Sequence, residues 1–273
     1  MPATTTEGTN GNGKLRVAAI GDLHVMENSV APYRELFTEI SSHADVLLLC
    51  GDLTNFGKTS EAEILAEDIK SCAIPVLGVL GNHDYECGQP EVVCEILHAA
   101  GMVVLDEQAH EIDGVGFAGV KGFAGGFGRG ALGPWGEVAI KQFVQAAVDE
   151  ALKLEAALAR LRTPLRVAVL HYSPIRGTVE GEPVEIFPYL GSSRLEEPIN
   201  RYRVSAVFHG HAHRGTAEGR TATGVPVYNV AMPLLARLNP DRPPFLVLEL
   251  PLEGGAHPSH PAGQIGDPLV RTA

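Results

Sequence analysis

Five short segments of the sequence carry carboxylate, imidazole or amide side chains at or just after the end of an apolar run. They read Gly21-Asp22-Leu23-His24, Gly51-Asp52, Gly81-Asn82-His83-Asp84, His171 and Gly210-His211-Ala212-His213. Carboxylates and imidazoles are common ligands of transition metals, and imidazole is also the commonest general acid or base. The chemistry that these residue types could perform is therefore metal binding combined with proton transfer.

Each segment by itself also has an ordinary structural interpretation. Asp22 or Asp52 after a strand could be a helix cap or a turn residue, and "GNHD" could be a polar turn that happens to contain a histidine. His171 alone would more often be a hydrogen-bonded core histidine than a ligand. The ordinary interpretation would require five independent coincidences, one at each strand end. A single metal centre explains all five segments together, so the whole set favours it.

Strands must deliver these residues to one place. Apolar runs at 14–24, 44–54, 74–84, 165–174 and 204–213 predict five strands that end in the polar segments. Ligands of open α/β sheets bind beyond the carboxyl ends of the strands, so we expect one site there. Because a strand presents residues i and i+2 on one side, D-x-H at 22–24 and H-x-H at 211–213 are expected to aim paired ligands at one point.

Helical patterns alternate with the first strands. We expect helices at 31–43, 59–72 with Ser60 as N-cap, 90–101, 138–162 and 192–202. This alternation is typical of βαβ units whose sheet is covered on both faces. Shorter runs at 102–107, 109–113 and 115–123 predict strands of a mixed sheet. We expect one domain over 14–252, with a disordered tail at 1–13 and a loose tail at 253–273.

Composition narrows the classes of function. The chain has 273 residues, 45% of them hydrophobic, and a formal net charge of −12. Such a charge disfavours a surface for long nucleic acids, but a small phosphorylated substrate remains compatible because bound cations reverse the sign locally. The four cysteines, Cys50, Cys72, Cys87 and Cys94, have no C-x-x-C spacing. Without a signal peptide or membrane span, a cytoplasmic location is expected.

The number of candidate ligands exceeds what one ion uses. Carboxylate and imidazole ligands without thiolate suit Mn, Fe, Zn, Ni or Co, and two adjacent ions are consistent with this set. Two ions about 3.5–4 Å apart can clamp an in-line displacement at phosphorus. A carboxylate and a hydroxide can each bridge such a pair.

The five segments together closely resemble the calcineurin-like metallophosphoesterase superfamily. Its pattern is D-x-H, G-D, G-N-H-D or G-N-H-E, a lone His and G-H-x-H, and all five blocks occur in this order over 21–213. The resemblance implies an α/β fold, a four-layer αββα sandwich of two mixed β-sheets flanked by helices. It also implies hydrolysis by in-line attack of a metal-bridging hydroxide.

The resemblance also implies a role for each residue. His83 is the expected phosphate-binding imidazole, and Asp84 the partner that orients its ring through a hydrogen bond. "HGHAH" contains two overlapping H-x-H frames, of which the family pattern selects His211/His213 and leaves His209 as a supporting residue. The expected metal ligands are Asp22, His24 and His213 for the first ion, Asp52 as the bridge, and Asn82, His171 and His211 for the second ion.

The segment "GDLTNFG" bears on the substrate. It lacks the arginine of the protein serine/threonine phosphatases, whose motif is G-D-x-V-D-R-G, and it resembles the branch containing class III cyclic-nucleotide phosphodiesterases. We therefore expect a phosphodiesterase that acts on a cyclic nucleotide or another small diester. The alternatives are a phosphomonoesterase acting on a small metabolite and a scaffold without catalysis. A helical HD phosphohydrolase is rejected because "PVLGVLG" is a poor helix.

Substrate choice is expected to come from loops. The candidates are Asn55, Phe56, Tyr85, Glu86, Arg129 and Tyr172 to Arg176. Arg129 is interpreted more readily as a solvated loop charge than as a phosphate ligand. Phe123, Phe127 and Trp135 could stack on a base, but packing beneath the loop is the favoured interpretation. The sequence contains no motif for a protein partner and leaves the oligomeric state open.

Overall fold

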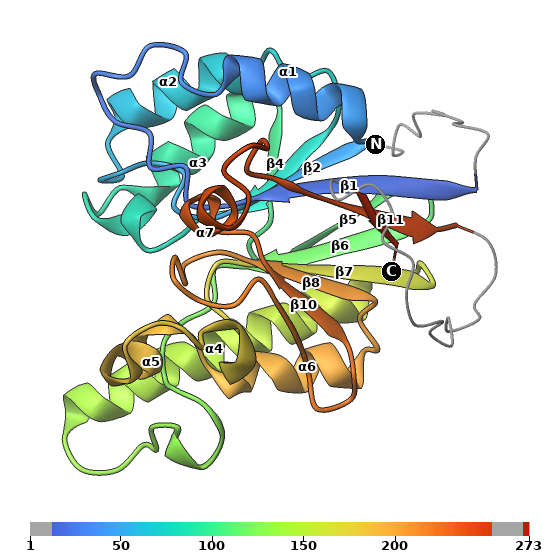
Figure 1. The fold of residues 1–273 in the computed structure, drawn as a ribbon. Coiled ribbons are helices and arrows are strands. Elements are labelled where there is room, and N and C mark those ends of the chain that lie inside the picture. Colours follow the sequence, from blue (N-terminus) through green and yellow to red (C-terminus); the bar gives the residue numbers. More distant parts are fainter. Residues whose placement is uncertain (1–12, 253–269, 273) are drawn as a thin grey trace.

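The structure is a computed structural model that describes residues 13–252 and 270–272. Two six-stranded sheets lie face to face, and helices cover their outer faces (Figure 1). This arrangement is the αββα sandwich expected from the sequence. The predicted tails, 1–13 and 253–273, lie outside the described residues apart from Gly13 and 270–272, so their disorder stays a prediction.

The first sheet has the strand order β12-β11-β1-β2-β3-β4. Its strands β1 to β4 run parallel to one another, whereas β11 is antiparallel to β1. The strands are β1 (Lys14–Ile20), β2 (Val46–Cys50), β3 (Val76–Val79), β4 (Met102–Val104), β11 (Leu246–Pro251) and β12 (Val270–Thr272). The helices that connect the parallel strands are α1 (Arg34–His43), α2 (Thr59–Ile69) and α3 (Pro90–Ala99).

The second sheet has the order β5-β6-β7-β8-β10-β9, with both edge strands antiparallel to their neighbours. The strands are β5 (Gln108–Ile112), β6 (Val115–Val120), β7 (Leu165–Leu170), β8 (Ala206–His209), β9 (Glu218–Arg220) and β10 (Pro226–Asn229). The remaining helices are α4 (Val138–Arg160), α5 (Phe187–Leu190), α6 (Glu196–Arg201) and α7 (Met232–Leu238). No helix in the described ranges is both long and apolar enough to cross a membrane.

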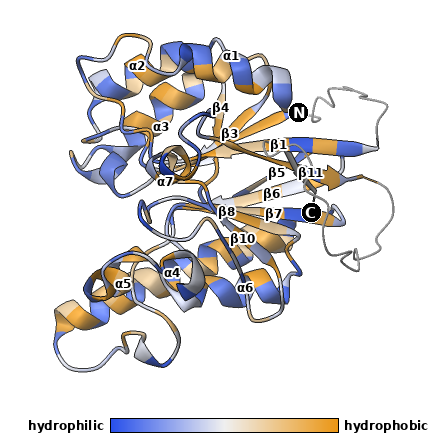
Figure 2. Cartoon of the chain, viewed as in Figure 1, coloured by the Kyte–Doolittle hydropathy of each residue, from blue (hydrophilic) through white to orange (hydrophobic). Residues whose placement is uncertain are grey.

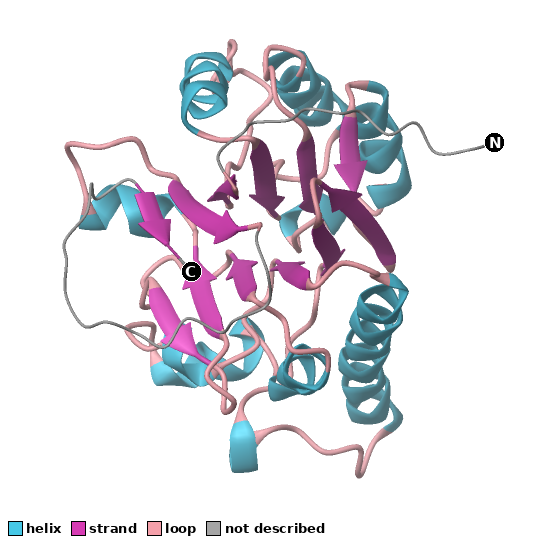
Figure 3. Cartoon of the chain, turned by 90° about the vertical axis from the view of Figure 1, so that its right-hand side faces the viewer, coloured by secondary structure: helices cyan, strands magenta, loops and turns pink. Residues whose placement is uncertain are grey.

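Three apolar layers separate the sheets and helices. Strand β1 shows how they form, because Leu15, Val17 and Ala19 pack between the two sheets, whereas Ala18 and Ile20 pack on the helical side. This period of two is the alternation of a strand that is buried on both faces. Figure 2 shows the resulting hydrophobic colouring of the central strands, and Figure 3 shows helices outside both sheets.

The start of α2 differs from the sequence prediction. Ser60 is not the N-cap, because the helix begins at Thr59 and the Ser60 hydroxyl instead donates to Glu27 at 2.9 Å. The buried carboxylate of Glu61 accepts from the backbone N–H of Phe56 at 2.7 Å and of Lys58 at 3.4 Å. The backbone N–H groups just before the helix are therefore accepted by the carboxylate of Glu61, which lies in the first turn.

The parallel strands deliver five loops to one edge of the sandwich. These loops follow β1, β2, β3, β7 and β8, as the sequence predicted. The strands are shorter than predicted, and β1 ends at Ile20 and β8 at His209. Two isolated bridges, Gly21 with Ala231 and Val25 with Thr54, tie the loops together. The candidate ligands therefore stand in connected loops rather than inside strands.

The packing between the sheets gives a test of the fold. Phe117 of β6 is 0% exposed in the layer between the two sheets. Phe117→Ala is expected to lower the free energy of unfolding by about 3–5 kcal/mol, because it leaves a cavity there. Urea denaturation followed by circular dichroism measures the change. Val30→Ala, at a side chain that is 91% exposed, is the control and should change stability by less than about 0.5 kcal/mol. Equal stability of both variants would contradict this packing.

Candidate metal centre

The predicted site residues converge at the carboxyl edge of the two sheets. Both sheets contribute, because β1, β2 and β3 belong to the first and β7 and β8 to the second. His83 and Asp84 lie in a short 3₁₀ turn, His83–Tyr85, that follows β3. The residues delivered are Asp22 and His24 after β1, Asp52 after β2, Asn82, His83 and Asp84 after β3, His171 after β7, and His211 and His213 after β8.

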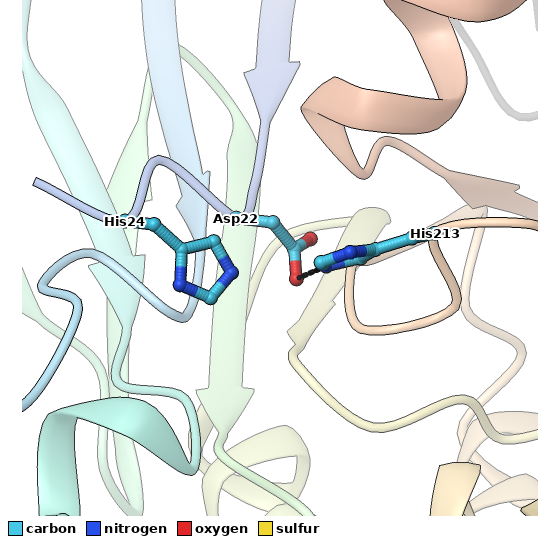
Figure 4. Close-up of side chains that lie close together, drawn as sticks. All are labelled: Asp22, His24 and His213. Carbon is cyan, nitrogen blue, oxygen red and sulfur yellow. Dashed lines mark hydrogen bonds and ion pairs between the residues drawn. The ribbon is translucent and has the colours of Figure 1, made fainter.

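Seven of these side chains form three overlapping groups. Within each group the possible ligand atoms all lie within 4.8 Å of one another. Asp52 belongs to two of the groups, so it links His24 and His83 on one side to His171 and His211 on the other. The groups are Asp22, His24 and His213; His24, Asp52 and His83; and Asp52, His171 and His211. Figure 4 shows the first of these, with the Asp22 carboxylate beside the His213 ring.

Direct contacts show how closely the donors approach. The Asp22 Oδ1 and His213 Nε2 atoms are 2.9 Å apart. His171 Nε2 lies 2.9 Å from Asn82 Oδ1 and 3.3 Å from Asp52 Oδ1. Asn82 therefore joins the third group, as its predicted place among the ligands of one ion requires. The three side chains come from three different strands.

The backbone at the ligands is unusual. Asp22, His24, Asp52 and His211 all have positive φ, between 46° and 71°. Residues other than glycine rarely adopt this left-handed conformation, and it concentrates at functional sites. It also corrects one prediction: D-x-H and H-x-H do not aim their ligands by strand alternation, because these residues lie beyond the ends of β1 and β8.

The glycines that precede the ligands are explained by close approach. A Cβ on Gly51, whose φ is +81°, would lie 2.5 Å from Nδ1 of His171. A Cβ on Gly81 would lie 2.1 Å from Oδ1 of Asp52. Both distances are shorter than any van der Waals contact, so the ligands reach each other only because these positions lack side chains. The glycines of G-D and G-N-H-D therefore belong to the site.

Electrostatics couple Asp52 to His171. Both side chains are buried, and Asp52 is 1% exposed. Burial favours the neutral form of each, but their mutual attraction is stronger. The His171 imidazole holds the pKa of Asp52 well below its usual range. Burial by itself would lower the pKa of His171, whereas Asp52 raises it to about 9. The positive charge on His171 thus stabilises the ionised carboxylate of Asp52. A bound cation would stabilise this carboxylate in the same way.

Two further imidazoles, His211 and His24, are biased towards the neutral form that binds metals, whereas the hydrogen bond to Asp22 raises the pKa of His213. Burial lowers the pKa of His211 to about 3 and also lowers the pKa of His24. The buried Nε2 atom of His24 has no hydrogen-bond partner among the described residues. An unpartnered buried nitrogen beside two carboxylates is the environment expected of a metal ligand. The donor set therefore fits divalent transition-metal ions.

His83 and Asp84 do not interact as predicted. His83 Nδ1 lies 2.7 Å from the Asn55 carbonyl oxygen, so that carbonyl, rather than a carboxylate, orients the ring. The prediction that Asp84 orients the His83 ring is wrong: every hydrogen bond described for Asp84 goes to a donor outside that ring. Neighbouring side chains in a helical turn diverge, and Asp84 turns inward where buried N–H groups need an acceptor. Those donors are the N–H groups of Leu53, Thr54 and Gly81 and the Thr54 hydroxyl.

His209 has a separate role. Its Nε2 lies 2.8 Å from the Thr178 hydroxyl and its Nδ1 lies 2.8 Å from the Gly210 carbonyl. Burial lowers its pKa to about 4. His209 belongs to none of the three groups, so it supports the loops after β7 and β8, whereas His211 and His213 point ligand atoms at the site.

The aromatic residues of the 122–137 loop differ from one another. Phe123 packs against Phe143 with ring centroids 5.0 Å apart, and Phe127 packs on a small buried cluster, as the packing interpretation predicted. Trp135 is 72% exposed, so that interpretation is wrong for this residue. Arg129 is exposed as well, which agrees with a solvated loop charge.

Solved structures of known proteins share this fold. A phosphopantetheinyl hydrolase from Mycobacterium tuberculosis has a TM-score of 0.63 at 15% identity, covering 92% of this chain and 99% of that one. A putative 5′-nucleotidase from Staphylococcus aureus has a TM-score of 0.51 at 16% identity, covering 80% of this chain and 48% of that one. At these identities the likeness shows the fold alone.

Sequence comparison gives the family. A probable cyclic nucleotide phosphodiesterase from Synechococcus sp. is 25% identical over 226 residues, which are 77% of each chain. An uncharacterized protein from Methanocaldococcus jannaschii is 34% identical over 109 residues, 40% of this chain and 44% of that one. The family model for calcineurin-like phosphoesterases matches residues 15–215, which include every predicted site residue. The chain belongs to the calcineurin-like phosphoesterase family.

Proposed function

We propose that the protein is a two-metal phosphodiesterase that hydrolyses a small phosphodiester, with a cyclic nucleotide as the first candidate. One observation carries the proposal: Asp52 joins the second and third ligand groups and His24 joins the first and second, so the three groups form one continuous centre. The Synechococcus relative described as a probable cyclic nucleotide phosphodiesterase supports the choice of a diester. The net charge of −12 supports a small substrate rather than a long nucleic acid.

The proposed ligands divide between two ions. Asp22, His24 and His213 hold the first ion, and Asn82, His171 and His211 hold the second, while Asp52 is shared. When bound, the two ions supply a water of lowered pKa as nucleophile and neutralise the charge of the phosphate. Mn, Fe, Zn, Ni and Co all suit this mixture of carboxylate, imidazole and amide ligands.

His83 is the proposed acid or phosphate-binding group. Its ring centroid lies 4.6 Å from that of His24, and its backbone N–H donates to Asp52 at 2.9 Å. Because the Asn55 carbonyl fixes Nδ1 as a donor, Nε2 is left to meet the substrate. With both ring nitrogens protonated, the imidazole can donate from Nε2 to a phosphoryl oxygen or protonate the leaving oxygen.

Asp84 is proposed as a positioning residue. Its carboxylate, buried by the loops it connects, accepts four hydrogen bonds from the segments that follow β2 and β3. It therefore fixes Asp52 and Asn82 relative to each other, without contacting the substrate.

A panel of substrates with added Mn²⁺ tests the proposed activity. It contains bis-p-nitrophenyl phosphate, p-nitrophenyl phosphate, and 3′,5′- and 2′,3′-cyclic nucleotides. Faster hydrolysis of the diesters supports the proposal, and the cyclic nucleotides then define the substrate class. Hydrolysis of the monoester alone would replace the proposal with a phosphomonoesterase. Absence of all hydrolysis with two ions bound would point to a specialised substrate outside the panel and direct attention to the 122–137 loop.

Asp52→Asn is expected to lower the rate of hydrolysis by about a thousandfold or more, because the two ions lose their shared carboxylate. Metal analysis of the purified protein should show fewer than two ions per chain. Asp113→Asn is a matched control, since Asp113 is an exposed aspartate with φ of 46°, close to the 48° of Asp52. Normal metal content and rate in Asp52→Asn would refute the shared position.

His83→Gln is expected to keep both ions and to lower kcat by about a hundredfold or more, because general acid catalysis contributes about 10²–10⁴-fold. Metal analysis and steady-state kinetics measure the two quantities. The exposed His98 provides the control variant, His98→Gln, which should behave like the wild type. Loss of metal from His83→Gln would make His83 a ligand instead.

Removal of metal is expected to destabilise the protein as well as inactivate it. The carboxylates of Asp22 and Asp52 are both buried, so bound ions that neutralise their charge should stabilise the native state. At a hundredfold excess over Kd, a single ion contributes about 2.7 kcal/mol. Thermal unfolding with chelator and then with excess Mn²⁺ measures this effect. An unchanged melting temperature in both conditions would count against a metal centre at these residues.

A further inference from the structure

Lys121 stands beside the metal centre without a role in the chemistry described so far. It directly follows β6, at the same edge of the second sheet as His171. Its ammonium group lies over three aromatic rings, 5.2 Å from the centre of Tyr85, 5.1 Å from Phe123 and 5.3 Å from Tyr172. These contacts hold the cation in one place through cation–π attraction.

The three rings connect Lys121 to the proposed site. The Tyr172 ring lies 4.5 Å from that of His211 and 5.4 Å from that of His171. Tyr85 belongs to the same 3₁₀ turn as His83. The Lys121 carbonyl also accepts the backbone N–H groups of His171 and Tyr172, both at 3.1 Å. The ammonium group is therefore one ring away from the ligands of the proposed second ion.

Lys121 makes no ion pair within the part of the chain that the structure describes. The carboxylate with the largest electrostatic effect on it, Glu150, has other partners: it accepts from the Gly122 N–H at 2.7 Å and pairs with Lys153 at 3.1 Å. Asp106 also pairs with Lys153, at 3.2 Å. A largely buried lysine ammonium is normally paired with an anionic group.

The hydrogen bonds of Lys121 leave donors for a ligand. Nζ donates to the Gly122 carbonyl at 2.9 Å, and a lysine ammonium has three N–H groups. Aromatic faces attract the cation but do not accept hydrogen bonds of ordinary strength. They also exclude water, which strengthens the attraction between the cation and an anion.

We propose that Lys121, with Tyr85 and Tyr172 as its walls, forms a subsite that binds an anionic oxygen group on the part of the substrate that is not hydrolysed. The reacting phosphate is matched by the metal centre, whereas Lys121 lies over the Tyr172 ring that contacts His211, so Lys121 meets a different group of the substrate. The inference rests on the proposed function and adds a substrate class to it: phosphoesters that carry a second negative charge, such as a carboxylate or a further phosphate.

Paired substrates test the subsite. A series of carboxyalkyl p-nitrophenyl phosphates of increasing chain length is compared with the matching alkyl esters, each pair differing only in the carboxylate. The wild type is expected to prefer one or more of the charged esters. Lys121→Met should lower this preference, measured as a ratio of kcat/KM values, by about tenfold, because a charge-assisted hydrogen bond is lost. Lys121→Arg should retain most of it.

Controls separate recognition from folding. Lys153→Met removes a nearby lysine that pairs with Glu150 and Asp106, and it should leave the preference unchanged. Melting temperatures identify variants that fold poorly, and the ratio of two substrates is independent of the active fraction. A ratio in Lys121→Met equal to that of the wild type would overturn the subsite.

Binding without turnover keeps the two proposals apart. Calorimetric titration of the Mn-loaded protein with carboxyalkyl and alkyl phosphonates reports the subsite whichever ester the enzyme hydrolyses. A wild type that fails to hydrolyse diesters but shows a preference for the carboxylate that depends on Lys121 would overturn the diesterase proposal and support the subsite. Equal affinities for both phosphonates in the wild type would overturn the subsite alone.

Discussion

The buried carboxylate of Asp52 is the constraint on which the site depends. It is 1% exposed, and its charged form is stabilised by His171 from the other sheet and by the N–H of His83. An ionised carboxylate at such a depth requires positive charge around it, because burial by itself disfavours the charge. Metal ions meet that requirement more fully than one imidazolium does, and in doing so they would form the reactive centre.

Convergence on Asp52 shapes the backbone around it. Strands from two sheets approach so closely that Gly51 and Gly81 have no room for a Cβ, and four of the candidate ligands adopt left-handed backbone conformations. Local strain of this kind persists only where the surroundings enforce it. Asp84 helps to hold this conformation, since its buried carboxylate accepts hydrogen bonds from N–H groups of the loops after β2 and β3. The rigidity of the site thus comes from loops bonded to each other above two packed sheets.

The candidate metal centre and the proposed subsite at Lys121 occupy different parts of this edge. The metal centre uses residues within the family match, 15–215, and relatives with a similar fold include proteins described as acting on different substrates. A fold of this kind therefore does not define the substrate, and the side chains around the centre must do so. Tyr172 lies against His211, a proposed ligand of the second ion, and Lys121 lies over the Tyr85 and Tyr172 rings.

The sequence by itself predicted the strands and the residues that come together at their ends, whereas the two-sheet layers were implied by the resemblance to a known family. Apolar runs that end in Asp, Asn and His, repeated five times in a fixed order, indicate one shared site. This works because parallel strands bring their carboxyl ends to one edge whatever the details of packing. The N-cap prediction at Ser60 was wrong for a local reason. The Glu61 carboxylate accepts the backbone N–H of Phe56 before the helix, and this contact depends on how the preceding loop folds.

Only the tertiary structure decided which groups touch. Sequence neighbours suggested that Asp84 orients His83, but the turn separates their side chains and the Asn55 carbonyl takes that place. Spacing suggested paired ligands on a strand, yet left-handed residues beyond the strand direct them. Lys121 carried no motif, because two of the three rings around it, Tyr85 and Tyr172, come from loops that are distant in sequence. Periodicity records which face a residue occupies, whereas contacts between loops depend on how two sheets pack together.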